Sequence, residues 1–141
     1  MDAKEVRLLD AYLKRLFGNT RIRVVPKKAD AADVMVGEDR LGHLSVDDED
    51  EERSYNLEIK ITMGEPASVK NIRTLEAYLR RNFDNDQIRV VGRPRKTDSA
   101  EVFLGDEYIG VLFFDEKDGK SAFFEMAILA LDLDDAAAGH I

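Results

Sequence analysis

Apolar residues recur at helical spacing near the start of the chain and again about half a length later. The first stripe consists of Val6, Leu9, Leu13, Leu16 and Phe17, and the second of Ile72, Leu75, Leu79 and Phe83. Each stripe predicts an amphipathic helix that buries one face. Asp2 and Ser68 occupy the expected N-cap positions, whereas Gly18 and Asp84 tolerate the left-handed conformation that ends a helix.

Alternating apolar and polar residues follow each predicted helix and indicate β-strands. The clearest case has Tyr55, Leu57, Ile59 and Ile61 on one side of a strand and Asn56, Glu58 and Lys60 on the other. Residues 37–40 (GEDR) are expected to form a four-residue hairpin loop, as are residues 105–108 (GDEY) in the second half. Each half is therefore predicted to be one helix on a four-stranded antiparallel sheet, an α+β fold.

The two halves are copies of one sequence. DAYLKRLFGNTRIRVV (10–25) corresponds to EAYLRRNFDNDQIRVV (76–91), and the correspondence continues through the last strand. We assign residues 1–62 to repeat 1, 63–67 to a linker, 68–135 to repeat 2 and 136–141 to a flexible tail. Because a fold of about 65 residues is marginal by itself, we expect the repeats to pack as an intrachain dimer with a pseudo-twofold axis.

Residues 76–135, from EAYLRRNF to LALDLDD, resemble a family of short bacterial domains of unknown function, which are typically encoded as a single copy. The first half departs from this pattern where GRPRKTDSAE (92–101) is replaced by PKKADAAD (26–33). The resemblance implies that the chain is a tandem duplication of such a domain. It implies no catalytic residues, because the family has none assigned.

Composition narrows the class of protein further. The chain has 141 residues, 44% of them hydrophobic, a formal net charge of −8 and no cysteine. The negative charge disfavours non-specific binding to nucleic acid or to an anionic membrane, and disulfides and thiolate metal sites are excluded. No apolar run approaches the roughly 20 residues of a membrane span, and the charged start does not resemble a signal peptide. We expect a soluble cytoplasmic protein.

Neither catalysis nor metal binding is indicated by the polar residues. His43, Ser45 and Asp47 suggest a triad, but Val111 and Phe113 replace the first two in repeat 2. The only other histidine, His140, is in the tail. The acidic run DDEDEE (47–52) lacks the glycine that a calcium loop needs and is better read as a solvated hairpin loop. We therefore predict a protein that is not an enzyme and that needs no metal or cofactor.

Basic residues cluster around the first strand of each repeat. They include Arg21 and Arg23 in repeat 1 and Arg89, Arg93, Arg95 and Lys96 in repeat 2. Such a stripe could contact phosphates although the chain as a whole carries a net negative charge. Few aromatic residues accompany it for base stacking. The alternative is that these side chains pair with an acidic protein partner.

The two repeats differ most on the second face of the sheet. His43, Ser45, Asn56 and Lys60 in repeat 1 are replaced by Val111, Phe113, Phe123 and Ala127 in repeat 2. Exposed apolar clusters mark interfaces, so we predict a partner-binding patch formed by Val111, Phe113, Phe123 and Leu129. Alternatively, the body of repeat 1 or the segment 127–133 covers this face.

These patterns favour a non-enzymatic protein-interaction or regulatory module, whose partner is another protein or a second copy of the chain. Nucleic-acid binding through the basic strands is the alternative. A small-molecule sensor is a third class, which no particular residue supports. No membrane association is expected.

Overall fold

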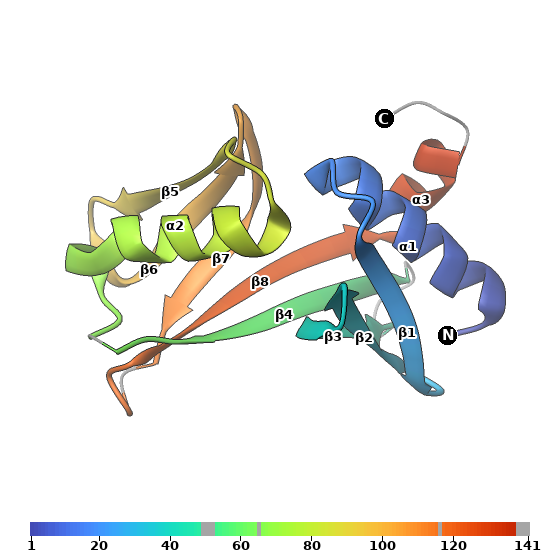
Figure 1. Cartoon of the computed structure of the whole chain (residues 1–141), viewed down its shortest axis with the longest axis horizontal. Coiled ribbons are helices and arrows are strands. Elements are labelled where there is room, and N and C mark those ends of the chain that lie inside the picture. The colour runs from blue at the N-terminus through green and yellow to red at the C-terminus, as the bar shows by residue number, and fades with distance from the viewer. Residues whose placement is uncertain (49–52, 65, 116, 138–141) are drawn as a thin grey trace. The chain divides into compact units, whose positions relative to one another are not determined.

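The computed structural model describes residues 1–48, 53–64, 66–115 and 117–137 (Figure 1). Repeat 1 contains α1 (Ala3–Phe17), β1 (Ile22–Lys28), β2 (Ala31–Val36), β3 (Asp39–Asp47) and β4 (Ser54–Thr62). Repeat 2 contains the 3-10 turn η1 (Val69–Asn71), α2 (Ile72–Phe83), β5 (Ile88–Arg93), β6 (Lys96–Leu104), β7 (Glu107–Phe114) and β8 (Ser121–Leu129), and then α3 (Ala130–Ala137). The predicted order of one helix and four strands is confirmed in both repeats. Residues 49–52 of the acidic run and residues 138–141 of the tail, which include His140, lie outside the described residues, whereas residues 136–137 of the tail form the end of α3.

The ends of the helices follow the predicted caps, with one exception. Asp2 and Glu5 form a capping box, in which the Glu5 backbone N–H donates to Asp2 Oδ1 at 2.8 Å. Gly18 and Asp84 adopt left-handed conformations, with φ of 63° and 52°. Ser68, by contrast, caps the turn η1 and not α2 itself, because its hydroxyl accepts from the Lys70 N–H.

The hairpins between β2 and β3 and between β6 and β7 are tighter than predicted. Val36 pairs with Asp39 and Leu104 pairs with Glu107, so each turn has two residues and not four. A glycine with a φ of 62°, Gly37 or Gly105, occupies the first position of each turn. This conformation, which glycine adopts without steric cost, allows a two-residue connection.

The eight strands form one sheet in the order β1-β2-β3-β4-β8-β7-β6-β5. By its internal contacts the chain divides into two compact units. Unit 1 comprises Met1–Leu57 and Ala127–Ile141, and unit 2 comprises Glu58–Met126. The strand β4 therefore begins in unit 1 and ends in unit 2, and β8 does the opposite. Each unit is completed by the end of a strand from the other repeat.

The core of unit 2 depends on this exchange. Leu75, Leu79 and Phe83 of α2 are buried, and the ring of Phe83 meets that of Phe124 edge to face. Ile59 and Ile61, which lie in the last strand of repeat 1, are fully buried in the same unit. Because burying an isoleucine side chain contributes about 1.5–3 kcal/mol, these two residues are a substantial part of a small core.

An acidic side chain links each helix to an edge strand of the sheet. Asp10 of α1 accepts from the backbone N–H of Val24 at 3.0 Å, and Glu76 of α2 accepts from the backbone N–H of Val90 at 2.9 Å. Glu76 is nearly buried, and its charge is balanced by Arg73 at 2.7 Å. In each repeat, the carboxylate thus accepts from a backbone N–H on the outer side of the edge strand, where no neighbouring strand offers a carbonyl.

Unit 1 has a polar network that has no counterpart in repeat 2. Glu5 accepts hydrogen bonds from the Tyr55 hydroxyl and from Arg53 Nε, the latter at 2.6 Å. Burial alone would raise the pKa of Glu5, but these hydrogen bonds and the one from the Asp2 backbone lower it to about 2. Burial and the hydrogen bond to Glu5 raise the pKa of Tyr55 to about 12. The network ties the start of α1 to β4.

The terminal helix α3, which the sequence pattern did not predict, packs against α1 in unit 1 (Figure 1). It follows β8 directly, and the Ala130 N–H donates to the Arg53 carbonyl at 3.1 Å. Within the described ranges, no helix combines the length and the apolar character needed to cross a membrane.

Cleavage of the connection within Met63–Ala67 tests the shared strands. We expect the two fragments to stay associated, because Ile59 and Ile61 belong to the amino-terminal fragment but are buried in unit 2. Each fragment alone should lose its cooperative thermal transition. Size-exclusion chromatography after cleavage and circular dichroism of the separated fragments provide the measurements. Fragments that separate and melt at the temperature of the intact chain would contradict the expectation.

Candidate functional site

The helix-free side of the sheet in unit 2 carries a set of apolar residues that we call the apolar face. Its members are Val91, Phe103, Tyr108, Val111, Phe113 and Phe123. Phe113 of β7 and Phe123 of β8 are direct cross-strand partners. Such pairs lie about 4.5–5.5 Å apart at Cβ and share one face. The register therefore makes the two phenylalanines neighbours.

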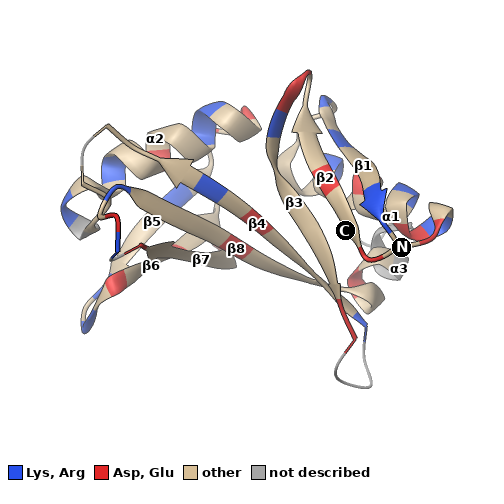
Figure 2. Cartoon of the chain, turned by 90° about the horizontal axis from the view of Figure 1, so that it is seen from below, with Lys and Arg blue, Asp and Glu red and all other residues tan. Residues whose placement is uncertain are grey.

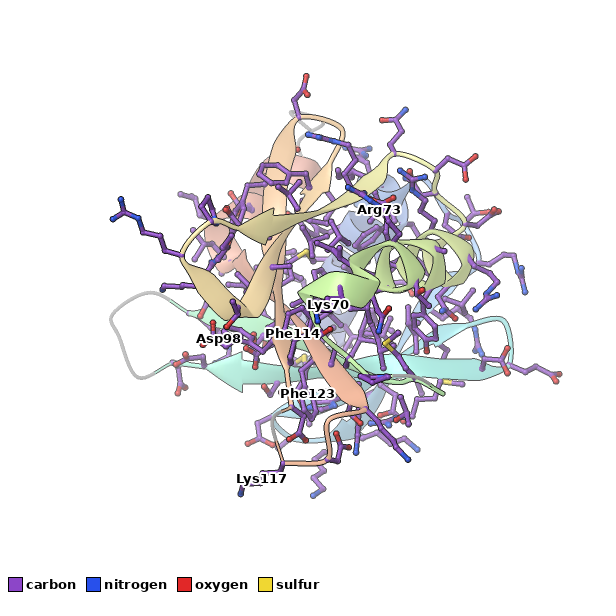
Figure 3. The ribbon with its side chains drawn as sticks, turned by 90° about the vertical axis from the view of Figure 1, so that its left-hand side faces the viewer. Lys70, Arg73, Asp98, Phe114, Lys117 and Phe123 are labelled. Carbon is purple, nitrogen blue, oxygen red and sulfur yellow. The ribbon has the colours of Figure 1, made fainter. Side chains whose placement is uncertain are left out.

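The apolar face is partly exposed to solvent. Phe113 is 40% exposed, Val91 39% and Tyr108 50%, whereas Val111 and Phe123 are half-buried. The neighbouring Phe114 points to the other side of β7 and is nearly buried. In the view of Figure 3, Phe114 is drawn nearer than Phe123 to Lys70, which precedes α2. Two neighbouring residues of β7 thus belong to opposite sides of the sheet, Phe114 to the core of unit 2 and Phe113 to the apolar face.

Carboxylates interrupt the apolar face along one row of the sheet. Glu101 lies opposite Val111, which lies opposite Glu125 on the next strand. Burial and then the negative charge of Glu58 raise the pKa of Glu125. Figure 2 shows the acidic positions on β4 and β8. The face therefore combines aromatic surface with negative charge.

Basic side chains border the apolar face at its ends. Lys60 Nζ lies 5.9 Å from the centre of the Phe123 ring, a distance typical of a cation–π contact. Arg89 lies over Phe103 at 5.4 Å, and the Phe103 ring meets that of Tyr108 edge to face. These contacts hold the aromatic side chains in place.

The corresponding face in unit 1 is polar. Ser45 lies opposite Ala31, and His43 lies opposite Asp33. Burial alone would raise the pKa of Asp33, but Arg40, 3.0 Å away, and Lys27 lower it. Ion pairs thus occupy in repeat 1 the region that carries aromatic side chains in repeat 2. The residue opposite His43 on the neighbouring strand is Asp33, which is not the serine of the triad considered from the sequence.

The structure brings together most of the predicted patch and adds to it. Val111, Phe113 and Phe123 lie on one face, as predicted, but Leu129 belongs to unit 1 and is not part of the apolar face. Sequence reasoning missed three members, which are Val91, Phe103 and Tyr108. The replacement of Arg40 by Tyr108 in the matching turns GEDR and GDEY was the available signal.

Within their own units, the predicted basic residues have different surroundings. Arg23 and Arg89 each donate to the carbonyl of a turn glycine, Gly37 at 2.8 Å and Gly105 at 2.9 Å, and so stabilise the hairpins. Arg21 also lies against Gly37. A separate cluster surrounds the turn between β5 and β6, where a cavity of about 430 Å³ is lined by Arg93, Pro94, Arg95, Lys96 and Glu101.

Across the described part of the chain, no His, Asp and Glu side chains gather in a group of three or more that could hold a metal ion. The acidic run 47–52, for which the sequence predicts a solvated hairpin loop, lies mostly in residues 49–52, outside the described ranges.

One family model matches the chain twice, over residues 5–63 and again over residues 71–132. The family is described as a protein of unknown function (DUF3126). Comparisons with curated proteins and with solved structures give no significant match. The two matched segments coincide with the two copies of one helix and four strands.

Replacement of Glu125 by glutamine tests the electrostatics of the apolar face. Because the pKa of Glu125 is raised, its ionisation costs stability that is regained when the carboxyl is protonated. We expect Glu125→Gln to stabilise the protein by about 0.5 kcal/mol at pH 7, and the gain should disappear as the pH falls below the usual range of a glutamate. Urea denaturation at pH 7 and pH 4 measures the effect. Equal gains at both pH values would argue against it.

Proposed function

The chain belongs to the DUF3126 family, as a tandem duplication of its domain, and from this premise we propose that it is a non-enzymatic protein-interaction module. The surface that binds the partner is the apolar face of unit 2. The observation that carries the proposal is the cross-strand pair of Phe113, which is 40% exposed, and Phe123, which is half-buried. Contiguous apolar surface with aromatic residues is typical of interfaces.

Comparison of the repeats supports this function. Repeat 1 has the same strands but carries Ser45 and Asn56 where repeat 2 carries Phe113 and Phe123. The fold therefore does not require aromatic residues at these positions. An aromatic surface that is left in part to solvent favours aggregation, so the presence of these residues in one repeat is best explained by a contact that they make.

Charge selects the kind of partner. Glu58, Glu101 and Glu125 lie on the same side of the sheet as the exposed phenylalanines, and the chain has a net charge of −8. A second copy of the chain, or a nucleic acid, would bring further negative charge to this surface. We infer that the partner is a protein whose apolar contact surface is bordered by Lys or Arg.

The double substitution Phe113→Ser and Phe123→Asn, which installs the residues of repeat 1, tests the proposal. Because Phe113 is 40% exposed and Phe123 is half-buried, we expect the variant to stay folded with only a small change in Tm. Partner binding should be lost. Thermal denaturation measures the first expectation, and affinity capture followed by titration of the purified partner measures the second.

The matched control for this experiment is the doublet Ser45→Ala and Asn56→Ala in repeat 1. It changes the same strand positions and should retain partner binding. A phenylalanine variant that melts early, with the loss of several kcal/mol expected for core truncation, would show that the face is internal. A partner that binds both doublets equally, or a concentration-dependent dimer of the wild type alone, would contradict the proposed function.

The alternative function is nucleic-acid binding through Arg93, Arg95 and Lys96. If the apolar face is the binding surface, we expect no retention on DNA or RNA even at about 50 mM salt, where phosphate contacts are strongest. Fluorescence anisotropy with labelled single- and double-stranded oligonucleotides provides the measurement. Binding that weakens with salt, and that loses its salt dependence when these three residues are changed to glutamine, would favour the alternative.

A further inference from the structure

The helix α3 covers one side of α1 in unit 1. Leu133 of α3 is buried, with only 2% exposed, and α3 packs along α1. Ala130 and Leu133 lie near Leu8 of α1 and Tyr55 of β4, because all four line one depression in this unit. The strand that enters unit 1 from the other repeat is therefore followed by a helix that packs on the side of α1.

The corresponding place beside α2 holds no helix from the described part of the chain. The strand β4 enters unit 2 as β8 enters unit 1, but the described residues between it and η1, which are 63, 64 and 66–68, are not helical. A cavity of about 420 Å³ lies there, lined by Ile61, Thr62, Met63, Gly64, Thr74, Leu75, Tyr78 and Arg81. We call it the α2 groove. Its volume lies within the range of ligand sites, about 300–1,000 Å³.

Alignment of the repeats shows that the α2 groove and the α3 contact are equivalent positions. The helical residues Thr74 and Tyr78 correspond to Leu8 and Tyr12. After the last strand, Met63 corresponds to Ala130, the first residue of α3. A cavity of similar volume, about 420 Å³, lies at each of the two positions, but only the one in unit 1 is lined in part by a helix that follows the last strand, through Ala130 and Leu133 of α3.

The chemistry of the α2 groove matches that of an amphipathic acidic helix. Its accessible apolar surface comes from Met63 and Tyr78, which are half-buried, and the fully buried Ile61 and Leu75 lie beneath them. Arg81 is exposed at its rim, and its guanidinium has no ion-pair partner among the described residues. The helix seated on α1 has the sequence ALDLDDAA, which carries three aspartates, buries Leu133 and leaves Leu131 63% exposed.

We propose that the α2 groove binds a short helix of a partner protein, whose leucine-like side chains enter the groove and whose acidic side chains face Arg81. This is the recognition of an amphipathic helix by a groove, and its occupant resembles α3. The site consists of other residues than the apolar face and does not depend on the function proposed for that face.

A peptide with the sequence of residues 127–137, AILALDLDDAA, provides the probe. It is titrated into the isotope-labelled full-length protein, and amide chemical shifts are followed by NMR. Because α3 already occupies the side of α1, we expect the shifts to concentrate at Ile61, Met63, Thr74 and Tyr78. A peptide with the change Leu133→Asp should not bind, because it lacks the apolar anchor.

Paired substitutions at equivalent positions separate the α2 groove from the side of α1. Arg81→Glu should weaken peptide binding by about tenfold, as expected for reversal of a charge at an interface. Arg15→Glu, the matching change on α1, should leave the affinity unchanged. Thr74→Leu, which installs the residue that α1 carries at Leu8, should tighten binding about threefold by adding buried apolar surface.

Three outcomes would overturn the proposal. The first is the absence of shifts in unit 2 at millimolar peptide. The second is a set of shifts confined to α1 and sensitive to Arg15→Glu, which would mean that the peptide only displaces α3. The third is a dimer in which α3 of one chain fills the α2 groove of another, detected as concentration-dependent sedimentation that Arg81→Glu abolishes. Well-dispersed amide spectra of each variant confirm that it is folded.

Discussion

The sharing of β4 and β8 between the two units is the constraint on which the rest of the structure depends. A helix with three strands leaves one side of its core open, and each unit closes that side with the end of a strand from the other repeat. Ile59 and Ile61 of repeat 1 are fully buried in the unit that contains α2. Neither repeat therefore holds all of the residues that its helix covers. Because buried apolar surface dominates the stability of small domains, each repeat depends on the other. Duplication within one chain keeps the two sets of strands together at high effective concentration.

Once the fold is shared in this way, the two copies can differ wherever the core does not constrain them. The link between helix and edge strand is retained, as Asp10 and Glu76 show. The helix-free sides of the sheet have diverged, since ion pairs around Asp33 in unit 1 are replaced by the apolar face in unit 2. The segments that follow the last strand of each repeat have diverged as well, because β8 continues into α3, which packs on α1, whereas the described residues between β4 and η1 are not helical. Both proposed binding surfaces lie where the two repeats differ. The apolar face has aromatic side chains where repeat 1 has polar ones, and the α2 groove lacks an equivalent of α3 among the described residues.

The candidate site was partly predictable because strand alternation is a local property. Alternation and the hairpin between β7 and β8 place Phe113 and Phe123 on one face without further information. Tyr108 was missed because its side depends on the irregular register between Val102 and Phe103, which shifts the pairing by one residue. Leu129 has the correct parity along β8, but it falls in the other unit, and parity carries no information about where a long strand passes from one core to another.

The sequence by itself determined the duplication, the α+β class, the order of one helix and four strands, and the capping of α1. These features depend on local periodicity and on residues close together in the chain. Only the tertiary structure decided that β4 and β8 are divided between two units, that α3 packs on α1, and that Arg23 and Arg89 close hairpins. Such contacts join residues far apart in the chain. The free energy of such contacts depends on which surfaces pack together. The pattern of apolar and polar residues along the chain is compatible with several packing arrangements.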